Sequence, residues 1–598
     1  MTAKDLKKKY FDFFVRRGHK KLPNFSLVPE NDPSALFISA GMHPLVPYLL
    51  GESHPSGKRL VSNQRCLRTD DIDEVGNNRH LTFMEMLGNW SLGDYFKKEQ
   101  LNWAFEFLTS PQWLALDPQK IYVSIFEGDK DAPRDEESII IWQEIYKKLE
   151  IKAKVGERIV PYPKKKNWWG PVGETGPCGP DSEIFYKTGK PHDPSFGKKC
   201  HINCDCGRFV EIWNNVFMEY NKTIEGKYEK LKKQNVDTGM GSERVAAVLQ
   251  GKETVFEIEL FSPIINQLEK LSKRDYAQNG RPFRIIADHL RAATFIISDG
   301  VLPSNKEQGY VLRRLIRRAI RYGRTLQIKE VFTPEVAEVV IKIMREEYPE
   351  LEKNKKEILG ALEDEEKRFQ KTISRGLKQI EKHKKLDGKI AFYLYETYGF
   401  PLELTEEIAH ERGQEINEQV FKKEFGEHQE LSRKGAAQKF TGGLADHSEE
   451  VTKLHTATHL LQAALRKVLG EEVSQKGSNI TAKRLRFDFS WKEKLNPEQI
   501  KQVEDLVSQI IKKNLPVEME IMLFETAKKQ GAMAVFGQKY GEEVKTYRVG
   551  LKEKPFSFEV CGGPHIDFTG KLGKFKIMKE EAVGSGTRRL YAKLEQSA

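Results

Sequence analysis

The stretch His455–Gly470, HTATHLLQAALRKVLG, governs the structure of the C-terminal part of the chain. Its apolar residues recur every three to four positions, which predicts an amphipathic helix that ends at Gly470. Because residues four apart share a helix face, both histidines can point at one ion. Further along, CGGPH adds a thiol and a third imidazole, and zinc binds this combination of ligands. The sequence therefore predicts a zinc site, the alternative being two helical histidines and an unrelated buried cysteine. The ligands are His455, His459, Cys561 and His565.

The composition is that of a multidomain globular protein. The chain has 598 residues, of which 31% are charged and 39% hydrophobic, so more than one core is expected. No apolar run approaches a membrane span, and the start MTAKDLKKKYFDFF reads as an amphipathic helix rather than a secretory leader. Six cysteines at this length favour a reducing cytoplasm over a disulfide framework. The net charge of +11 suits a polyanionic partner.

Residue patterns divide the chain into three parts. Residues 1–250 contain few βαβ spacings, which predicts an α+β fold with a mostly antiparallel sheet. Residues 251–435 have helical periodicity, and residues 436–598 form a smaller α+β unit with helices at 455–469 and 497–513. The polar segment KFTGGLADHSEE (439–450) marks the boundary. The expected strands of the first part are ALFISAG (35–41), KIYVSIFEG (120–128), SEIFYK (182–187) and FVEIWNNVFMEY (209–220).

Three basic segments are candidates for anion binding. QRCLRTDD (64–71) places Arg68 at the end of a strand, where a guanidinium loses little freedom on holding a phosphate. In VDTGMGSERVAAVLQG (236–251), glycines lead into a helix whose first turns carry Arg244, an arrangement that favours anions. YVLRRLIRRAIRYGR (310–324) sets six arginines beside an apolar stripe, which predicts contact with nucleic-acid phosphates. The alternatives are surface arginines, a surface turn and a solvated helix face.

These segments resemble a known family. Arg68, the loop after it and Arg79-x-x-x-Phe83 resemble motif 2 of class II aminoacyl-tRNA synthetases, and GMGSER (239–244) resembles motif 3. TFMEMLGNWSLGDYF, GETGPCGP, EIWNNVFMEYN, ADHLR and DGVLPSN resemble the alanyl-tRNA synthetase family, and HTATHLL, SQKGS and CGGPH resemble its editing domain. The resemblance implies a class II antiparallel sheet with flanking helices (1–250), a helical tRNA-recognition domain (251–435) and a zinc-binding editing domain (436–598).

The resemblance also implies an activity and its residues. ATP, with Mg²⁺, would activate L-alanine to the adenylate, and the alanyl group would pass to tRNA(Ala). Arg68 would neutralise the α-phosphate, Asp237 would bind the α-amino group, and Arg244 would hold the distal phosphates or cover the adenine. The remaining residues of the ATP and alanine pocket would be Met86, Trp169, Ile212, Trp213, Asn214, Val216 and Gly241.

A second active site is expected because a methyl-sized pocket rejects glycine or serine by only about 1–3 kcal/mol. The resemblance implies that the editing domain hydrolyses mischarged seryl- and glycyl-tRNA(Ala), with Gln475 taking part. If all four residues bind zinc, the ion has a structural role. If one of them dissociates, the open coordination position would let zinc activate water or bind substrate. For tRNA recognition, Asn305 and Glu396 would read a G·U pair. Glu396 stands where the family has aspartate. The acceptor stem would contact Arg313, Arg314, Arg317 and Arg318.

The chain departs from the family pattern in several places. Thr69-Asp70-Asp71-Ile72-Asp73 replaces a longer Gly-Gly-Lys-His-Asn loop, and Leu81 and Met84 stand where histidine and phenylalanine are usual. The segment 436–455 is too short for the β-barrel that usually precedes the editing core, and no C-terminal domain follows, so a monomer is expected. Cys200, Cys204 and Cys206 could hold a second, structural zinc, with His192, His201 or Cys178 as fourth ligand, or could be free cysteines.

Two other functions remain open at this stage. The altered motif 2 loop is compatible with a hydrolase that edits tRNA but no longer activates amino acids. The net charge and the arginine-rich segment are compatible with an RNA-binding protein that lacks enzymatic activity.

Overall fold

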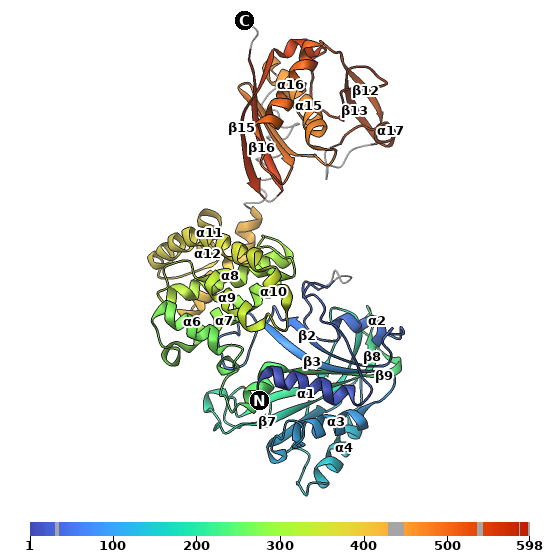
Figure 1. The fold of residues 1–598 in the computed structure, drawn as a ribbon, viewed down its shortest axis with the longest axis vertical. Helices are drawn as coiled ribbons and strands as arrows, with labels where there is room; N and C mark the ends of the chain where they lie inside the picture. Colours follow the sequence, from blue (N-terminus) through green and yellow to red (C-terminus); the bar gives the residue numbers. More distant parts are fainter. Residues whose placement is uncertain (30–34, 428–447, 535–541, 585, 596–598) are drawn as a thin grey trace. The chain divides into compact units, whose positions relative to one another are not determined.

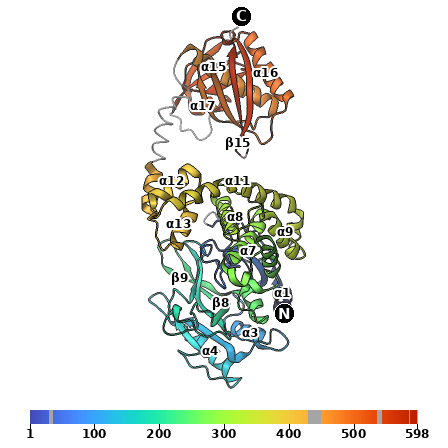
Figure 2. The same ribbon diagram turned by 90° about the vertical axis from the view of Figure 1, so that its left-hand side faces the viewer.

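The computed structural model describes residues 1–29, 35–427, 448–534, 542–584 and 586–595. The chain divides into two compact units, Met1–Leu386 with Tyr393–Glu415 and Asp387–Phe392 with Ile416–Ala598 (Figures 1 and 2). The predicted division at residue 250 falls inside the first unit. The predicted division at residue 435 and most of KFTGGLADHSEE lie outside the described residues. Within the described ranges, none of the helices has both the length and the apolar character needed to cross a bilayer.

The first unit is built on a nine-stranded sheet. Its main path has the order β1-β2-β3-β9-β8-β7-β4-β5, with β6 paired to β7. The pairs β1–β2 and β4–β5 at the two ends are parallel, and all the remaining pairs are antiparallel. This agrees with the mostly antiparallel sheet predicted from the sequence. The strands are β1 (Lys20–Lys21), β2 (Arg59–Leu67), β3 (Phe83–Leu92), β4 (Ile121–Phe126), β5 (Ile159–Tyr162), β6 (Trp168–Trp169), β7 (Gly176–Lys187), β8 (Phe209–Lys222) and β9 (Tyr228–Gly241).

One predicted strand is not formed. ALFISAG lies in irregular backbone, in which Phe37, Ile38 and Ala40 are buried and Leu36 is exposed. Ile38 donates a backbone hydrogen bond to Leu27 and accepts one from Leu67, so it lies beside the end of β2 without a ladder. Its side chain packs with Cys66 and Met86. An apolar run of this length can be buried as irregular chain when both backbone groups find partners.

Helices cover one face of the sheet. Trp213 on β8 packs its ring against Tyr10, Phe14 and Phe107, at centroid distances of 5.7, 6.3 and 5.9 Å. A capping box between Thr2 and Asp5 begins the first of these helices. Alternation along β8 then turns Asn214 and Val216 to the opposite face, which carries the cavity described below. The helices of this part are α1 (Ala3–Val15), α2 (Val46–Leu49), α3 (Lys97–Thr109), α4 (Glu136–Lys147) and α5 (Ser242–Leu249), with short 3-10 turns at His43–Leu45, Pro118–Lys120, Pro194–Phe196 and Val255–Glu257.

The rest of the first unit is helical, as predicted. A buried ionic network joins it to the sheet: Arg291 contacts Glu243 at 2.8 Å and Glu85 at 3.4 Å, and Lys7 contacts Glu85 at 2.8 Å. These side chains are almost completely buried, which explains why sheet and helices form one unit. The helices are α6 (Ser262–Ser272), α7 (Tyr276–Ser298), α8 (Glu307–Thr325), α9 (Thr333–Met344), α10 (Pro349–Lys353), α11 (Lys355–Lys382) and α13 (Leu402–Glu411). Helix α12 (Gly388–Tyr398) is divided between the two units at Tyr393.

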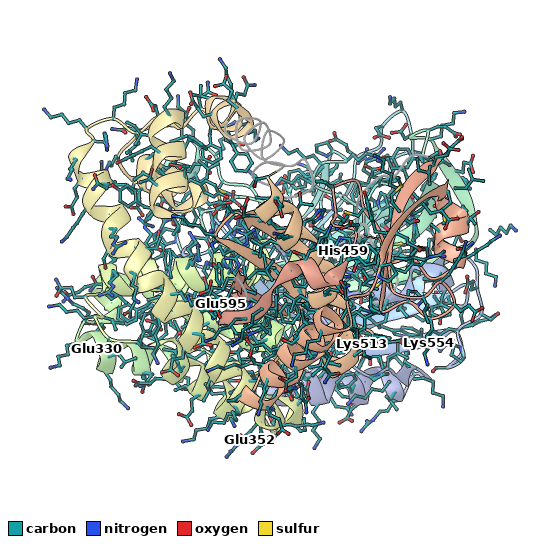
Figure 3. All side chains as sticks on the ribbon, turned by 90° about the horizontal axis from the view of Figure 1, so that it is seen from above. Glu330, Glu352, His459, Lys513, Lys554 and Glu595 are labelled. Carbon is teal, nitrogen blue, oxygen red and sulfur yellow. The ribbon has the colours of Figure 1, made fainter. Side chains whose placement is uncertain are left out.

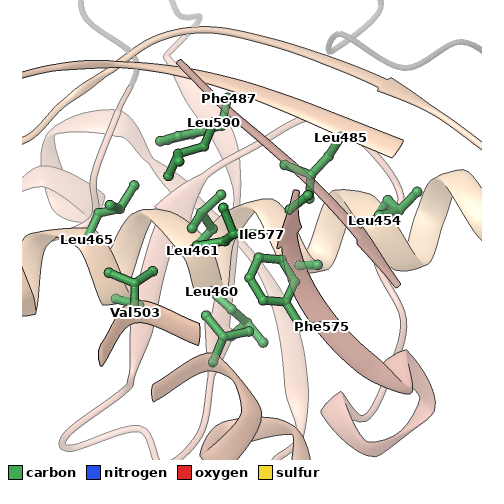
Figure 4. Packing of buried hydrophobic residues seen from close by; sticks show 14 of the residues in the cluster. Leu454, Leu460, Leu461, Leu465, Leu485, Phe487, Val503, Phe575, Ile577 and Leu590 are labelled. Atoms are coloured by element: carbon green, nitrogen blue, oxygen red, sulfur yellow. The ribbon is translucent and has the colours of Figure 1, made fainter. Parts of the chain in front are cut away.

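The second unit contains two sheets and two main helices. One sheet has the order β10-β11-β16-β15 and the other the order β12-β13-β14. Leu460, Leu461, Phe487, Val503 and Phe575 meet in one apolar core (Figure 4). Charged side chains project outward, among them Lys513 and Lys554, which Figure 3 labels. The elements are α15 (Glu449–Leu469), β10 (Gln475–Thr481), β11 (Arg484–Ser490), α16 (Pro497–Lys512), β12 (Val517–Leu523), α17 (Phe524–Lys529), β13 (Glu543–Val549), β14 (Ser557–Val560), a 3-10 turn (Thr569–Leu572), β15 (Lys574–Gly584) and β16 (Thr587–Glu595).

Candidate functional site

A cavity of about 420 Å³ lies on the open face of the nine-stranded sheet. The register of β7, β8 and β9 sets one row of residues across it, in which Val216 lies between Asp181 and Asp237. A neighbouring row places Asn214 beside Gly239. The cavity lining includes eight of the ten residues predicted for the ATP and alanine pocket: Arg68, Met86, Trp169, Asn214, Val216, Asp237, Gly241 and Arg244.

Asp237 is a buried carboxylate held by one strong donor. The indole Nε1 of Trp90 donates to its Oδ1 at 2.6 Å. Burial raises the pKa of Asp237 to about 7, against hydrogen bonds from Trp90 and the Thr238 backbone that lower it. A Cβ at Gly88 would lie 2.4 Å from the Trp90 ring, so this glycine leaves room for the indole. A fixed carboxylate in an apolar surrounding is a binding site for an ammonium group.

A second buried carboxylate, Asp181, was not predicted. Asn167 and Asn214 donate to its two oxygens at 2.8 and 2.9 Å, and burial raises its pKa to about 7. The Oδ1 atom of Asn214 is buried without a hydrogen-bond partner, so it can accept a bond from a ligand. In the sequence, Asp181 is a charged residue directly before the expected strand SEIFYK (182–187).

The two predicted phosphate-binding arginines both reach the cavity. Arg68 follows β2 directly and its guanidinium lies 5.5 Å from the Trp169 ring centre. Arg244 is in the first turn of α5, which Gly241 begins as N-cap, and its Nη1 contacts Glu211 at 2.9 Å. Glu211 also lines the cavity and was not predicted. The site thus combines cations from two elements with carboxylates from others.

Two predicted pocket residues do not line the cavity. Ile212 is 1% exposed and Trp213 is 0% exposed, and the indole of Trp213 lies in the aromatic core under α1 and α3. The backbone irregularity between Ile184 and Phe185 in the β7–β8 pairing occurs at this point and was not evident from the sequence. Trp213 therefore supports the sheet from behind, and Ile212 is buried outside the cavity lining.

Two acidic residues of the altered motif 2 loop have identifiable positions in the site. Asp73 contacts Arg314 of α8 at 2.7 Å, and Asp71 lines the cavity together with Arg79. Arg79 pairs with Asp205, which belongs to the segment that contains Cys204 and Cys206. The loop thus contacts the arginine-rich helix through Asp73, whereas the usual loop of the family carries a lysine.

The arginine-rich helix α8 differs from the prediction. Arg318 is 2% exposed and donates to Glu407 at 2.7 and 3.0 Å, so it is a buried structural cation rather than a surface phosphate ligand. Arg313 and Arg317 both contact Glu365, at 3.5 and 2.8 Å. An amphipathic helix must bury one stripe, and here part of that stripe is arginine paired with glutamate.

A basic hollow of about 680 Å³ lies on the same part of the first unit. The sequence analysis missed it because its residues come from two helices far apart in the chain, α8 and α11. Asn305 and Glu396, predicted to read the G·U pair, are both exposed. The hollow is lined by Arg324, Lys367, Arg368, Gln370, Lys371, Ser374 and Arg375.

The predicted zinc ligands of the second unit come together. The ligand atoms of His455, His459, Cys561 and His565 all lie within 4.8 Å of one another. The Cys561 thiol is 3.4 Å from Nε2 of His455, and tetrahedral zinc places sulfur and nitrogen ligands roughly 3.6 Å apart. Burial lowers the pKa of all three histidines, which keeps them in the neutral form that binds metals.

The surroundings of this cluster orient its nitrogen atoms. Nδ1 of His455 contacts the Pro564 carbonyl at 3.0 Å, and Nδ1 of His565 contacts the Thr456 hydroxyl at 3.1 Å. Nε2 of His565 is buried and has no hydrogen-bond partner. A buried nitrogen left free while its ring is held from the other side fits a metal ligand. Gln475, predicted to take part in editing, is the first residue of β10 and half-buried.

The second cysteine cluster also comes together. His192, Cys200, Cys204 and Cys206 place their ligand atoms within 4.8 Å of one another. Burial would raise the pKa of the Cys206 thiol, but hydrogen bonds, chiefly with His192, outweigh it and lower the pKa to about 6. Of the three candidates for fourth ligand, the structure brings His192 to the cysteines.

Comparison with known proteins gives a consistent result along the chain. Residues 5–491 match the family tRNA synthetases class II (A), and residues 544–591 match the threonyl and alanyl tRNA synthetase second additional domain. An alanine–tRNA ligase of Treponema denticola is 53% identical over 611 residues, which cover 100% of this chain and 99% of the relative. One from Borrelia hermsii is 51% identical and covers 99% of each, and one from Petrotoga mobilis is 37% identical over 99% of this chain and 79% of the relative. The chain therefore belongs to the alanyl-tRNA synthetase family of class II aminoacyl-tRNA synthetases.

Proposed function

We propose that the chain is an alanine–tRNA ligase whose first unit activates L-alanine with ATP in the 420 Å³ cavity and transfers it to tRNA(Ala). The observation that carries this assignment is the convergence of Arg68, Arg244 and Asp237 on one cavity with a small apolar wall. Mg²⁺ enters with ATP, and the carboxylate of Glu211 beside Arg244 is suited to hold it.

Activation requires alanine and ATP to be held in line. Asp237 binds the α-ammonium group, and the unpartnered Oδ1 of Asn214 accepts a second hydrogen bond from it. Arg68 neutralises the α-phosphate while a carboxylate oxygen of alanine attacks its phosphorus and pyrophosphate leaves. Arg244, at the N-terminus of α5, holds the distal phosphates. The protein contributes position and charge, because the phosphoryl chemistry needs no protein nucleophile.

Selection for alanine rests on a small apolar wall. Val216 and Trp169 belong to the same apolar cluster and both line the cavity, so they face the alanine methyl group. Such a wall excludes larger side chains by overlap, but glycine and serine differ from alanine by only about 1–3 kcal/mol in binding. The activation site alone is therefore insufficient for accurate charging.

The second unit is proposed to hydrolyse seryl- and glycyl-tRNA(Ala). Support comes from the additional-domain match and from the His455, His459, Cys561 and His565 cluster. When bound there, zinc supplies a fixed positive charge and a Lewis acid. The chain's own residues orient the imidazoles through Thr456 and the Pro564 carbonyl.

The basic hollow between α8 and α11 is proposed to contact the tRNA backbone. Its five cations, Arg324, Lys367, Arg368, Lys371 and Arg375, face one hollow and suit phosphate groups. Exposed Asn305 and Glu396 remain candidates for reading the acceptor stem. Arg318 is excluded from this role by its burial.

ATP–pyrophosphate exchange with alanine, glycine and serine tests the activation site. We expect exchange with alanine that is lost in Asp237→Asn and falls about 100-fold or more in Arg68→Ala. Hydrolysis of seryl-tRNA(Ala) is measured on the same preparation. Hydrolysis without exchange would instead identify an editing hydrolase, and salt-sensitive RNA binding with neither turnover would identify an RNA-binding protein.

A further inference from the structure

The cluster His192, Cys200, Cys204 and Cys206 has the geometry of a zinc site. The thiols of Cys200 and Cys206 are 3.8 Å apart, and the Cys204 thiol is 3.9 Å from Nδ1 of His192. With zinc–sulfur bonds of about 2.3 Å and zinc–nitrogen bonds of about 2.0 Å, tetrahedral ligands lie roughly 3.5–3.8 Å apart. The four side chains thus already have nearly the spacing of a Cys₃His site.

The environment of His192 supports the same conclusion. Its Nε2 contacts the Gly197 carbonyl at 2.8 Å, which requires that nitrogen to carry the proton. The lone pair is therefore on Nδ1, the atom that faces Cys204. A metal-bound histidine usually donates its other N–H to a carbonyl in this way.

The two other candidates for the fourth ligand point elsewhere. His201 is exposed, and its Nδ1 contacts the Tyr162 hydroxyl at 3.0 Å. Cys178 is buried in a different apolar cluster, with Phe126 and Tyr220. The structure thus selects one ligand from three that the sequence left open.

The loop that carries the cluster buries little apolar surface and is otherwise tied to the fold by polar contacts, such as Lys190 with Glu253 and Asn203 with Lys166. Residues 188–208 connect β7 to β8 with only one short 3-10 turn as regular structure. Of these residues, Ile202 and Cys204 alone are buried, which is too little apolar contact to fix a loop of this length. Yet Ile202, Asn203 and Asp205 line the activation cavity, and Asp205 pairs with Arg79.

We propose that His192, Cys200, Cys204 and Cys206 bind a structural zinc ion that fixes the 202–205 segment as a wall of the activation cavity. This zinc is distinct from the ion of the second unit. The role as a cavity wall rests on the proposed activation function, whereas the binding of the ion does not. Asp205 is a positioning residue in this scheme, acting through Arg79.

Zinc content per chain tests the binding, measured by elemental analysis of the untagged full-length protein. We expect two ions in the wild type, one in Cys200→Ser/Cys206→Ser and one in Cys561→Ala. His201→Ala is the matched control from the same loop and keeps two. A double variant that retains the wild-type zinc content would overturn the proposal, as would a Cys200–Cys206 disulfide detected by mass spectrometry of the purified wild type.

A second measurement does not depend on the folding of the double variant. In Cys561→Ala, this cluster is the only cysteine-containing metal site among the described residues. Replacement of its zinc by cobalt(II) should give thiolate-to-cobalt charge-transfer absorption, and absence of that absorption contradicts the site.

Loss of the ion should raise the KM for ATP about tenfold and leave the KM for alanine unchanged. If the wild type shows no alanine-dependent exchange at all, the proposed function fails while the zinc count still stands.

Discussion

Replacement of Asp237 by asparagine should make the protein more stable and inactive at the same time. Burial raises the pKa of Asp237 from 3.8 in the unfolded chain to about 7 in the folded one. Between these values the folded state binds a proton that the unfolded state has released. Stability therefore falls as pH rises from about 4 to about 7, because the carboxylate must be buried charged or kept protonated. Asparagine removes this cost and can still accept the Trp90 hydrogen bond.

The size of the effect follows from the same two pKa values. Their difference of about 3 units, at about 1.4 kcal/mol per unit, gives an upper limit of about 4 kcal/mol at pH 8. Below about pH 3 the difference should vanish, since the carboxyl is then protonated in both states. The alanine ammonium group recovers this cost in the wild type by pairing with the ionised carboxylate.

Urea unfolding at a series of pH values, followed by tryptophan fluorescence, measures the effect. Only Trp491 of the eight tryptophans lies in the second unit, so the signal reports mainly on the first. Asp135→Asn is the control, because Asp135 is buried but contacts Lys97 at 2.7 Å, and its loss should lower stability. An Asp237→Asn chain no more stable than the wild type at pH 8 would refute the reasoning.

Three further predictions concern the other sites. Trp90→Phe removes the indole N–H that holds the buried Asp237, so it should raise the KM for alanine at least tenfold in the exchange assay. Trp142→Phe is the control, because it loses an indole hydrogen bond to Ser182 and should leave this KM unchanged. Cys561→Ala should keep full exchange but accumulate seryl-tRNA(Ala) when charged with serine, and rapid clearance of that product would contradict the editing assignment. Arg318→Ala should lower the free energy of unfolding in urea by about 3–5 kcal/mol. Arg368→Ala should leave that free energy unchanged and reduce the salt dependence of tRNA binding by about one phosphate contact. A stable Arg318→Ala variant with weakened tRNA binding would contradict the structural role of Arg318.

The extent to which the site could be predicted depended on whether a residue's role is local. The histidines of α15 were found because four-residue spacing on a helix fixes their common direction. Asp237 and Arg68 were assigned from the family resemblance, and the cavity brings them together as expected. The antiparallel sheet followed from strand patterns without βαβ spacing.

What could not be predicted depends on partners distant in sequence. The burial of Arg318 is set by Glu407, and nothing in the helix itself distinguishes this arginine from Arg317. Asp181 was missed because its importance comes from Asn167, in the bend before β6, and from Asn214 on β8. The irregularity in the β7–β8 pairing falls at Ile212, which lies between the paired residues Glu211 and Trp213, and it has no composition signal. Long-range pairing decides these cases, and a single sequence does not reveal it.

The buried network at the base of α5 argues that the activation site needs part of the helical region. Glu243 and Arg244 are consecutive, but Glu243 is held by Arg291 of α7 at 2.8 Å, whereas Arg244 reaches the cavity. A fragment 1–250 would lack Arg291 and the helices that cover Glu243 and Glu85, so the ion pairs that fix the start of α5 could not form. We expect this fragment to lack exchange activity and a cooperative urea transition. A fragment 1–427, which keeps α7, should retain both, and equal activity of the two fragments would show that Arg291 is dispensable for placing Arg244.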